Sequence, residues 1–338
     1  MTRITQQLPV VEGVDRARFE NEIFPAGKPV IMKGLVAEWP AVKAAQTSNR
    51  AVADYISAMD TTGQMVGISV LSATKQGRFF YNDDLTGYNF MGDRNRVSNL
   101  LGWLLENGDR EDRVTLYAQA IPLTPLMPAF ERANPMDLVS PTFGAKMWVG
   151  NKVRTQTHFD PSHNIACLVA GKRRFTLFPP EQIDNLYPGP FDFAPGNIPV
   201  SMAAIEEPDF ERYPLLEEAL KHAQYGDLEP GDAIFIPYAW WHHVQSQTGF
   251  NVLVNYWWNT NMTDWVSPVG ALYAAILAVR DLPPAEKQFW QKVMQRYVFD
   301  DPEPAAAHLP ESGRYAFGKT TKALRERLRG LIKTTLRL

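Results

Sequence analysis

The chain has 338 residues, of which 45% are hydrophobic and 21% charged, and its formal net charge is −3 at pH 7. These values are ordinary for a globular protein and give no electrostatic case for a nucleic acid or an anionic membrane as partner. The single cysteine, Cys167, excludes an internal disulfide, and with no signal-peptide or membrane-spanning pattern evident we expect a cytoplasmic protein.

The first 143 residues mix predicted helices, strands and loops. Hydrophobic periodicity predicts helices over 14–23, 48–60 and 97–106, and strands over 29–34, 65–71 and 114–119. Most of 72–112 is polar and is expected to form loops, and proline-rich, irregular chain continues to about residue 143. This half of the chain therefore predicts no regular repeat of elements.

From residue 145 onward, short strands follow one another closely. We expect them over 145–149, 154–159, 164–170, 173–178, 233–237, 241–247 and 251–258, with one more short strand before the turn at 229–232. Gly171 marks a hairpin, and the weakly periodic insertion at 181–215 is a candidate lid or substrate loop. This spacing predicts a mainly β fold: a double-stranded β-helix, or jelly roll, of the cupin kind with surrounding helices.

Beyond about residue 262 the period becomes helical, with helices expected over 266–279, 284–298 and 319–336. We therefore divide the chain into a β-rich domain, 1–261, and a C-terminal helical extension, 262–338. The surplus of apolar surface predicts that this extension packs on the barrel or forms a homodimer. Eight Lys and Arg residues between 314 and 337 are interpreted as a solvated helix face rather than as a site for an anionic partner.

The most informative motif is His158-Phe159-Asp160, followed far downstream by His242. Two imidazoles and one carboxylate are the ligand set of non-haem Fe(II) oxygenases, which leave coordination positions open for a co-substrate and dioxygen. On a strand, alternation would point His158 and Asp160 to the same side, and His242 would arrive from a second strand. The same residue types also suit catalytic Zn²⁺, but a zinc hydrolase needs a general base, and no such carboxylate is evident beside the motif.

Several segments together resemble one known family, the cupin-like jumonji-C 2-oxoglutarate oxygenases, and within it the branch of the asparaginyl hydroxylase of hypoxia-inducible factor. The resemblance covers about residues 10–260 and is carried by the segments 29–40, 155–160, 171–180, 231–244 and 255–257. It implies Fe(II) held by His158, Asp160 and His242, with 2-oxoglutarate and dioxygen as co-substrates. His243 is expected to face away from the metal, as a structural histidine.

The resemblance also implies a binding site for 2-oxoglutarate. The family has a lysine fifteen residues after the first ligand histidine, whereas this chain has Arg173 there, with Lys172 beside it as the alternative. An arginine can bind a carboxylate through two hydrogen bonds. The remaining implied co-substrate residues are Tyr117, Thr155, Asn164 and Asn255.

For the substrate, the resemblance favours hydroxylation of a C–H bond in a protein or peptide side chain, with Trp257 and Trp240 as candidates for the substrate wall. Demethylation uses the same ligand set and stays open. A small metabolite as substrate, or a non-catalytic metal-binding cupin module, is the alternative. We expect no nucleic acid and no membrane as partner, and we expect that residues 72–112 and 181–215 determine the substrate.

Overall fold

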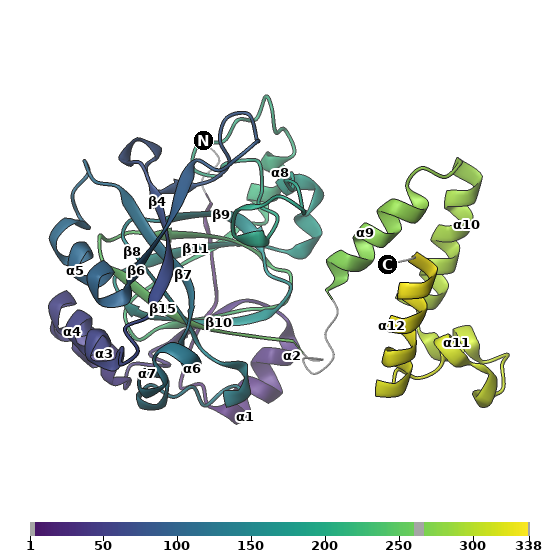
Figure 1. Ribbon diagram of the computed structural model, residues 1–338, viewed down its shortest axis with the longest axis horizontal. Coiled ribbons are helices and arrows are strands. Elements are labelled where there is room, and N and C mark those ends of the chain that lie inside the picture. Colours follow the sequence, from purple (N-terminus) through teal and green to yellow (C-terminus); the bar gives the residue numbers. More distant parts are fainter. Residues whose placement is uncertain (1–3, 260–266, 337–338) are drawn as a thin grey trace. The chain divides into compact units, whose positions relative to one another are not determined.

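The computed structural model describes residues 4–259 and 267–336. The chain divides into two compact units, Met1–Asn259 and Thr260–Leu338 (Figure 1). The domain boundary expected at residues 261 and 262 lies outside the described residues.

The first unit contains two mixed β-sheets. Their strands are β1 (Gln6–Gln7), β2 (Val10–Glu12), β3 (Val30–Lys33), β4 (Met65–Leu71), β5 (Arg78–Phe79), β6 (Phe90–Arg96), β7 (Thr115–Pro122), β8 (Lys146–Gly150), β9 (Arg154–Phe159), β10 (His163–Ala170), β11 (Arg173–Phe178), β12 (Gln224–Leu228), β13 (Ala233–Ile236), β14 (Trp241–Ser246) and β15 (Asn251–Trp258). The six-stranded sheet has the order β1-β12-β11-β14-β9-β5, and the nine-stranded sheet has the order β2-β3-β13-β10-β15-β8-β7-β4-β6.

Strands β8 to β15 form the jelly roll. Strands β8, β10, β13 and β15 lie in the larger sheet and β9, β11, β12 and β14 in the smaller, with antiparallel pairing inside each set. The chain crosses from one sheet to the other at most connections, as in a double-stranded β-helix. The predicted cupin-like fold is confirmed, and the predicted bounds of β4, β9, β11 and β15 agree with the structure.

Side-chain alternation along β10 divides the interior into two apolar regions. Ile165, Cys167 and Val169 belong to the main core, which the helices cover, whereas Ala166 and Leu168 belong to a second cluster between the two sheets. Successive residues of a strand point to opposite faces of its sheet, so one strand contributes to both regions. The second cluster forms the floor of the cavity that contains the predicted metal ligands.

Helices cover the outer face of the larger sheet (Figure 1). The helices of this unit are α1 (Arg16–Arg18), a π-helical turn (Phe19–Ile23), α2 (Phe24–Ala26), α3 (Pro40–Thr47), α4 (Asn49–Met59), α5 (Val97–Asn107), α6 (Leu123–Leu126), α7 (Pro128–Ala133) and α8 (Leu216–Lys221), and its short 3₁₀ turns are Ala73–Lys75, Pro141–Phe143, Pro180–Gln182, Asp184–Leu186 and Pro195–Asn197.

Several of these elements correct the sequence-based expectation. Strands β5 and β6 lie in the segment predicted as loop, and helices α6 and α7 lie in the segment predicted as irregular. Strand β6 is mostly solvent-exposed on both faces, so its sequence has no alternation of apolar and polar residues to detect. Proline begins α3 and α7 at the first helical position, where its missing N–H costs no hydrogen bond, although proline was interpreted as a sign of irregular chain.

The second unit is helical. Its elements are α9 (Pro268–Val279), α10 (Pro284–Met294), a π-helical turn (Gln295–Phe299), α11 (Pro302–Ala306), 3₁₀ turns at Glu311–Gly313 and Tyr315–Phe317, and α12 (Lys322–Leu336). Tyr297 and Phe317 stack with their ring centres 4.2 Å apart, and Arg314 Nη1 lies 3.1 Å from Glu303 Oε2. In the described part of the chain, no helix has both the length and the apolar character needed to cross a membrane.

Candidate metal centre and adjoining cavities

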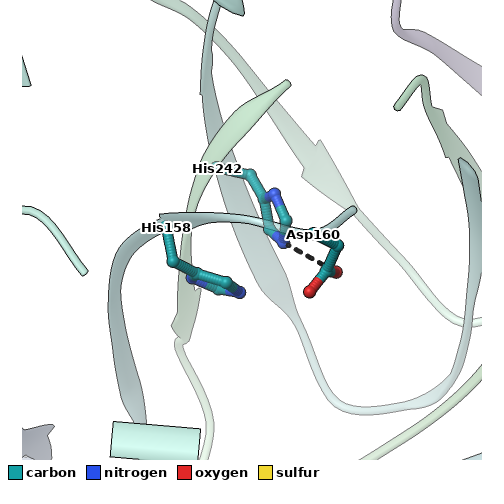
Figure 2. A group of neighbouring side chains, drawn as sticks. All are labelled: His158, Asp160 and His242. Atoms are coloured by element: carbon teal, nitrogen blue, oxygen red, sulfur yellow. Dashed lines mark ion pairs between the residues drawn. The ribbon is translucent and has the colours of Figure 1, made fainter. Parts of the chain in front are cut away.

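The three predicted metal ligands converge at one end of the space between the sheets (Figure 2). Strands β9 and β14 are antiparallel neighbours, and their register places His158 opposite His242. Asp160 directly follows β9. The alternation argument had assumed that Asp160 lies on the strand, and the structure corrects this point. One potential ligand atom from each of the three side chains lies within 4.8 Å of the others, and all three residues are buried.

Backbone hydrogen bonds orient both imidazoles. His158 Nδ1 lies 2.7 Å from the Gln156 carbonyl oxygen, and His242 Nδ1 lies 3.1 Å from the Trp240 carbonyl oxygen. When each Nδ1–H donates to its carbonyl, each Nε2 keeps a free lone pair, which is how metal-binding histidines are commonly held. The turn before β14 is tied to the same place, because the Ala239 N–H donates to the Asp160 carbonyl oxygen at 3.1 Å.

The electrostatics of the three residues favour a bound cation. Asp160 Oδ2 lies 3.6 Å from His242 Nε2 and has no hydrogen-bond partner among the described residues. Burial raises the pKa of Asp160, although His158 and then Trp257 oppose this rise. Burial, followed by the neighbouring His158, lowers the pKa of His242 well below its usual value. A buried carboxylate oxygen without a hydrogen-bond partner beside two imidazoles fits a divalent metal ion, whose charge would compensate the carboxylate.

The residues that line the surrounding cavity help to distinguish an Fe(II) oxygenase site from a zinc hydrolase site. Two histidines and one carboxylate with open positions are typical of Fe(II) oxygenases, and they can also bind catalytic zinc. A zinc hydrolase needs a further general base, and among the described residues Asp160 is the only Asp or Glu in this lining. The lining consists of Tyr117, Trp148, Thr155, His158, Asp160, Asn164, Ala166, Arg173, Phe175, His242, Val244, Leu253, Asn255 and Trp257.

Arg173 brings a positive charge into this cavity. Its side chain is buried, and neither Nε nor Nη2 has a hydrogen-bond partner among the described residues. Burial lowers the pKa of Arg173, while the neighbouring Tyr117 opposes this effect. Burial likewise raises the pKa of Tyr117, and Arg173 and Thr155 oppose the rise. A buried guanidinium without a counter-ion is costly, so this position fits an anionic ligand.

Two predicted residues lie outside the lining. The side chain of Lys172 is exposed, and its Nζ is 3.4 Å from Glu229 Oε1 on the surface. Trp240 packs on the apolar cluster between the sheets. Lys172 directly precedes β11, and its side chain lies on the surface, whereas that of Arg173 is buried. Of these two predicted pairs, Arg173 and Trp257 therefore line the cavity, and Lys172 and Trp240 do not.

Asn164 and Asn255 form a polar group on the larger sheet. Asn255 Nδ2 donates to Asn164 Oδ1 at 3.1 Å, and Trp148 Nε1 donates to Asn255 Oδ1 at 2.7 Å. Sequence reasoning missed Trp148, although it alternates along β8 with buried apolar neighbours and so could have been assigned to the cavity face. Trp148 and Trp257 meet edge to face, with ring centres 5.6 Å apart.

A second cavity of about 250 Å³ adjoins the first. It shares His158, Thr155, Tyr117, Trp148 and Trp257 with the metal cavity, and the rest of its lining consists of Phe79, Phe90, Gln119, Ala120, Gln156, Pro195, Gly196, Ile198 and Val200. Residues from both segments expected to determine the substrate, 72–112 and 181–215, therefore form its wall.

These two segments contact one another directly. The Tyr88 ring stacks on Phe193 with ring centres 5.0 Å apart, and Tyr81 Oη donates to the Phe193 carbonyl oxygen at 2.7 Å. Tyr88 Oη also donates to the Ala194 carbonyl oxygen at 3.0 Å. The wall of the second cavity is thus held in place by aromatic contacts between distant parts of the sequence.

Two further histidines near the site, His243 and His163, do not belong to the predicted ligand set. His243 faces away from the ligands, and its Nε2 lies 2.8 Å from Glu206 Oε1. Burial raises the pKa of Glu206, but the contact with His243 outweighs burial and lowers the pKa to about 2. His163 accepts a hydrogen bond from the Tyr238 N–H at 3.1 Å. Glu206 had no signal in the sequence, because it lies in the weakly periodic insertion.

Comparisons with known proteins show which family the chain is similar to. Residues 16–264 match a family model described as a cupin-like domain. A protein of Arabidopsis thaliana named lysine-specific demethylase JMJ31 is 37% identical over 133 residues, which cover 37% of this chain and 24% of that protein. Jumonji C domain-containing protein 5 of Drosophila melanogaster is 25% identical over 266 residues, which cover 76% and 62% of the two chains.

A third relative has a different named role. The tRNA wybutosine-synthesizing protein 5 of Gallus gallus is 24% identical over 271 residues, covering 75% of this chain and 77% of that protein. The match spans less than two thirds of the Arabidopsis and Drosophila relatives and more than two thirds of the chicken relative.

Proposed function

The chain belongs to the cupin-like family that includes the jumonji-C proteins, and from this premise we propose that it is an Fe(II)- and 2-oxoglutarate-dependent dioxygenase. The observation that carries the proposal is the convergence of His158, Asp160 and His242 beside the buried, unpaired Arg173. Bound iron would explain why His158, Asp160 and His242 converge. A bound anionic co-substrate would explain why the Arg173 guanidinium is buried there. A metal site alone would leave Arg173 unexplained.

The residues of the metal cavity would hold the iron and the co-substrate. His158 and His242 would bind Fe(II) through Nε2 and Asp160 through a carboxylate oxygen, and ligand sets of this kind leave positions for a co-substrate and dioxygen. When bound, the iron supplies the activation of dioxygen that is coupled to decarboxylation of 2-oxoglutarate to succinate. Arg173 would bind the distal carboxylate of the co-substrate, with the hydroxyl groups of Tyr117 and Thr155 beside it. Asn164 and Asn255 would position the co-substrate, and Trp257 would exclude water.

For the substrate, we propose hydroxylation of a C–H bond in a protein or peptide side chain. The support is the second cavity, which opens from His158 and has room for one side chain. The names of the relatives include a demethylase and a tRNA-modifying protein, so the expectation that nucleic acid is excluded has no support from them. A small metabolite remains the alternative substrate.

Release of succinate tests the chemistry without knowledge of the substrate. Protein loaded anaerobically with Fe(II) and 2-oxoglutarate is exposed to air, and succinate is measured for wild type, His158→Ala, Asp160→Ala and the control His222→Ala. His222 is an exposed surface residue paired with Glu218. We expect a slow uncoupled release that the two ligand variants lose by at least about 100-fold and the control keeps. Equal release in all four proteins would refute the proposal.

Two further measurements separate the rival functions. Metal analysis combined with a hydrolase assay would identify a zinc enzyme, which would bind zinc without turning over 2-oxoglutarate. A non-catalytic cupin module would bind Fe(II) in anaerobic titrations but would release no succinate.

We also propose that the helical unit forms a homodimer. Leu277, Val298 and Phe299 are between 69% and 80% exposed, which is unusual for large apolar side chains in one small unit. Dimers that bury one shared apolar patch are the commonest assemblies. Cytoplasmic location remains a prediction.

A further inference from the structure

Lys146 lies on the cavity face of the larger sheet. Along β8 it alternates with Trp148 on the same side, whereas Met147 and Val149 belong to the main core. Its cross-strand neighbour on β15 is Asn255, which lines the metal cavity. The Lys146 ammonium lies 4.4 Å from the centre of the Trp257 ring, and that ring lines both cavities. The positive charge therefore lies at the edge of the proposed substrate site.

Within residues 4–259 and 267–336, this ammonium has no ion-pair partner. Among the residues that the structure describes, no carboxylate lies within ion-pairing distance of Lys146 Nζ, and the amine donates no hydrogen bond. The side chain is about half-buried, so burial lowers the pKa of Lys146, while the charge of Asp160 opposes that effect. A metal bound at Asp160 would cancel the one nearby negative charge. The lysine would then be the unbalanced charge closest to an incoming substrate.

The adjoining cavity indicates what kind of group it can accept. Its described lining contains no Asp, Glu, Lys or Arg, and the side chains that form most of it are aromatic or aliphatic. Its volume of about 250 Å³ corresponds to about eight water molecules at about 30 Å³ each, which is room for one uncharged side chain. A charged group would enter without a counter-ion, at a high desolvation cost.

Resting on the proposed function, we propose that Lys146 selects the substrate by charge: the oxidised side chain is uncharged, and an acidic residue of the same peptide binds the Lys146 ammonium. The second cavity would accept the uncharged side chain, and the Lys146 ammonium at its edge would attract the acidic residue. Opposite charges at a site edge add specificity, and like charges are rejected.

Two other substrates fit these observations less well. A methylated lysine could bind an aromatic wall through cation–π contacts, but Trp257 already has the Lys146 ammonium over its ring, and the wall offers no carboxylate to a second cation. A nucleic acid needs several cations along its phosphates. The described contacts place Lys146 over Trp257 and Arg78 beside Gln156 at this lining, and Arg78 has Glu206 and Glu207 as charged neighbours.

Binding without turnover tests the inference. Full-length protein is loaded with Fe(II) and 2-oxoglutarate without dioxygen, and labelled peptides are titrated by fluorescence anisotropy. Two pooled heptapeptide libraries share a degenerate uncharged central residue and carry either Glu or Lys on both sides of it. A trimethyl-lysine library and a seven-nucleotide RNA are titrated as further probes. Binding of Fe(II) and 2-oxoglutarate is measured in the same samples, so failure of the proposed function is seen separately.

Variants of Lys146 test whether its positive charge causes the preference. We expect wild type to bind the Glu library at least about tenfold more tightly than the Lys library, Lys146→Gln to lose the preference and Lys146→Glu to reverse it. The matched control is Lys152→Glu, which makes the same charge change at an exposed lysine outside both cavities and should keep the wild-type ratio. Thermal unfolding of each variant confirms that it is folded.

Four outcomes would overturn the inference. They are a wild-type preference for the Lys or trimethyl-lysine library, an equal shift in Lys152→Glu, binding of neither peptide library, and binding of the RNA alone. In each case intact binding of Fe(II) and 2-oxoglutarate would leave the proposed chemistry standing.

Discussion

Arg173 shows how a single residue can be costly for the fold and useful for the site. A buried guanidinium loses its hydration, and the described residues provide no carboxylate to replace it. In the core of a protein this arrangement is destabilising, and it is found where a ligand supplies the missing partner. The jumonji-C family that this chain resembles has a lysine at this position. The planar guanidinium can form two parallel hydrogen bonds with a carboxylate, which an ammonium cannot.

Replacement of Arg173 should therefore have opposite effects on stability and on binding. We expect Arg173→Met to raise the free energy of unfolding of the ligand-free protein by about 1–3 kcal/mol, because an unpaired buried charge is removed. We expect the same variant to lose affinity for 2-oxoglutarate by at least about 100-fold. Urea unfolding and anaerobic calorimetry measure the two quantities.

Arg173→Lys is the matched variant for this prediction. It keeps the charge and should lose much less affinity than Arg173→Met. A methionine variant that is less stable than wild type and still binds 2-oxoglutarate normally would contradict the assignment of Arg173 to the co-substrate.

At the scale of elements, the insertion between β11 and β12 is fastened to the two strands that carry the histidine ligands. Gln156 of β9 donates from Nε2 to the carbonyl oxygens of Ser201 and Ala203, at 2.9 and 3.0 Å. His243 of β14 pairs with Glu206. The insertion thus forms a wall of the substrate cavity whose position depends on the metal-bearing strands, and we infer that it moves little while these contacts last.

The pair between Glu206 and His243 should make stability depend on pH. The pKa of Glu206 is lowered from 4.5 to about 2, so between these values the folded protein binds fewer protons than the unfolded chain. The contribution is complete above pH 4.5 and is lost as the pH falls through 2. From about pH 6 to about pH 3 we expect the wild type to lose about 2 kcal/mol more than Glu206→Gln, measured by denaturant unfolding.

The neighbouring Glu207 provides the control. Among the contacts of the described residues, none of this kind holds Glu207 against β14, so Glu207→Gln should keep the wild-type dependence on pH. If Glu206→Gln and wild type lose stability in parallel, the ion pair does not contribute to the fold.

At the scale of the whole molecule, the two units have different kinds of surface. The barrel unit has a large buried core, with many side chains that are fully shielded from water. In the helical unit, helix α9 is apolar on most of its sides, yet none of its residues is buried. Exposed apolar surface on this scale is costly in water, and association between copies would remove part of it.

The proposed dimer can be tested by single substitutions. We expect Leu277→Arg and Phe299→Arg each to weaken self-association by at least about tenfold, because an apolar contact is replaced by a charge. Sedimentation velocity over a range of concentrations measures this. The control is Met91→Arg, at a residue of the barrel unit that is 72% exposed. A wild type that is monomeric at all concentrations, or an equal effect of all three changes, would refute the dimer.

The sequence alone predicted the parts of this protein that depend on local patterns. Alternation of apolar and polar residues located the jelly-roll strands, since each of them has a buried face. The residue types of His158, Asp160 and His242, together with the resemblance to the jumonji-C oxygenases, predicted the metal ligands. The same resemblance implied Arg173 as the co-substrate residue, with Lys172 as the alternative. Where the local pattern is weak, as in the exposed strand β6 and the short helices that begin with proline, the prediction was incomplete.

Only the tertiary structure decided which of these residues meet. The register of β9 against β14 brings His158 to His242, and the packing of two unpatterned segments creates the second cavity. The same packing placed Lys172 and Trp240 outside the metal cavity and Lys146 over Trp257. No sequence motif predicted the position of Lys146. The physical reason is that burial pattern and turn chemistry act over a few residues, whereas a binding site is formed by side chains that are distant in sequence and are joined only when the sheets close on one another.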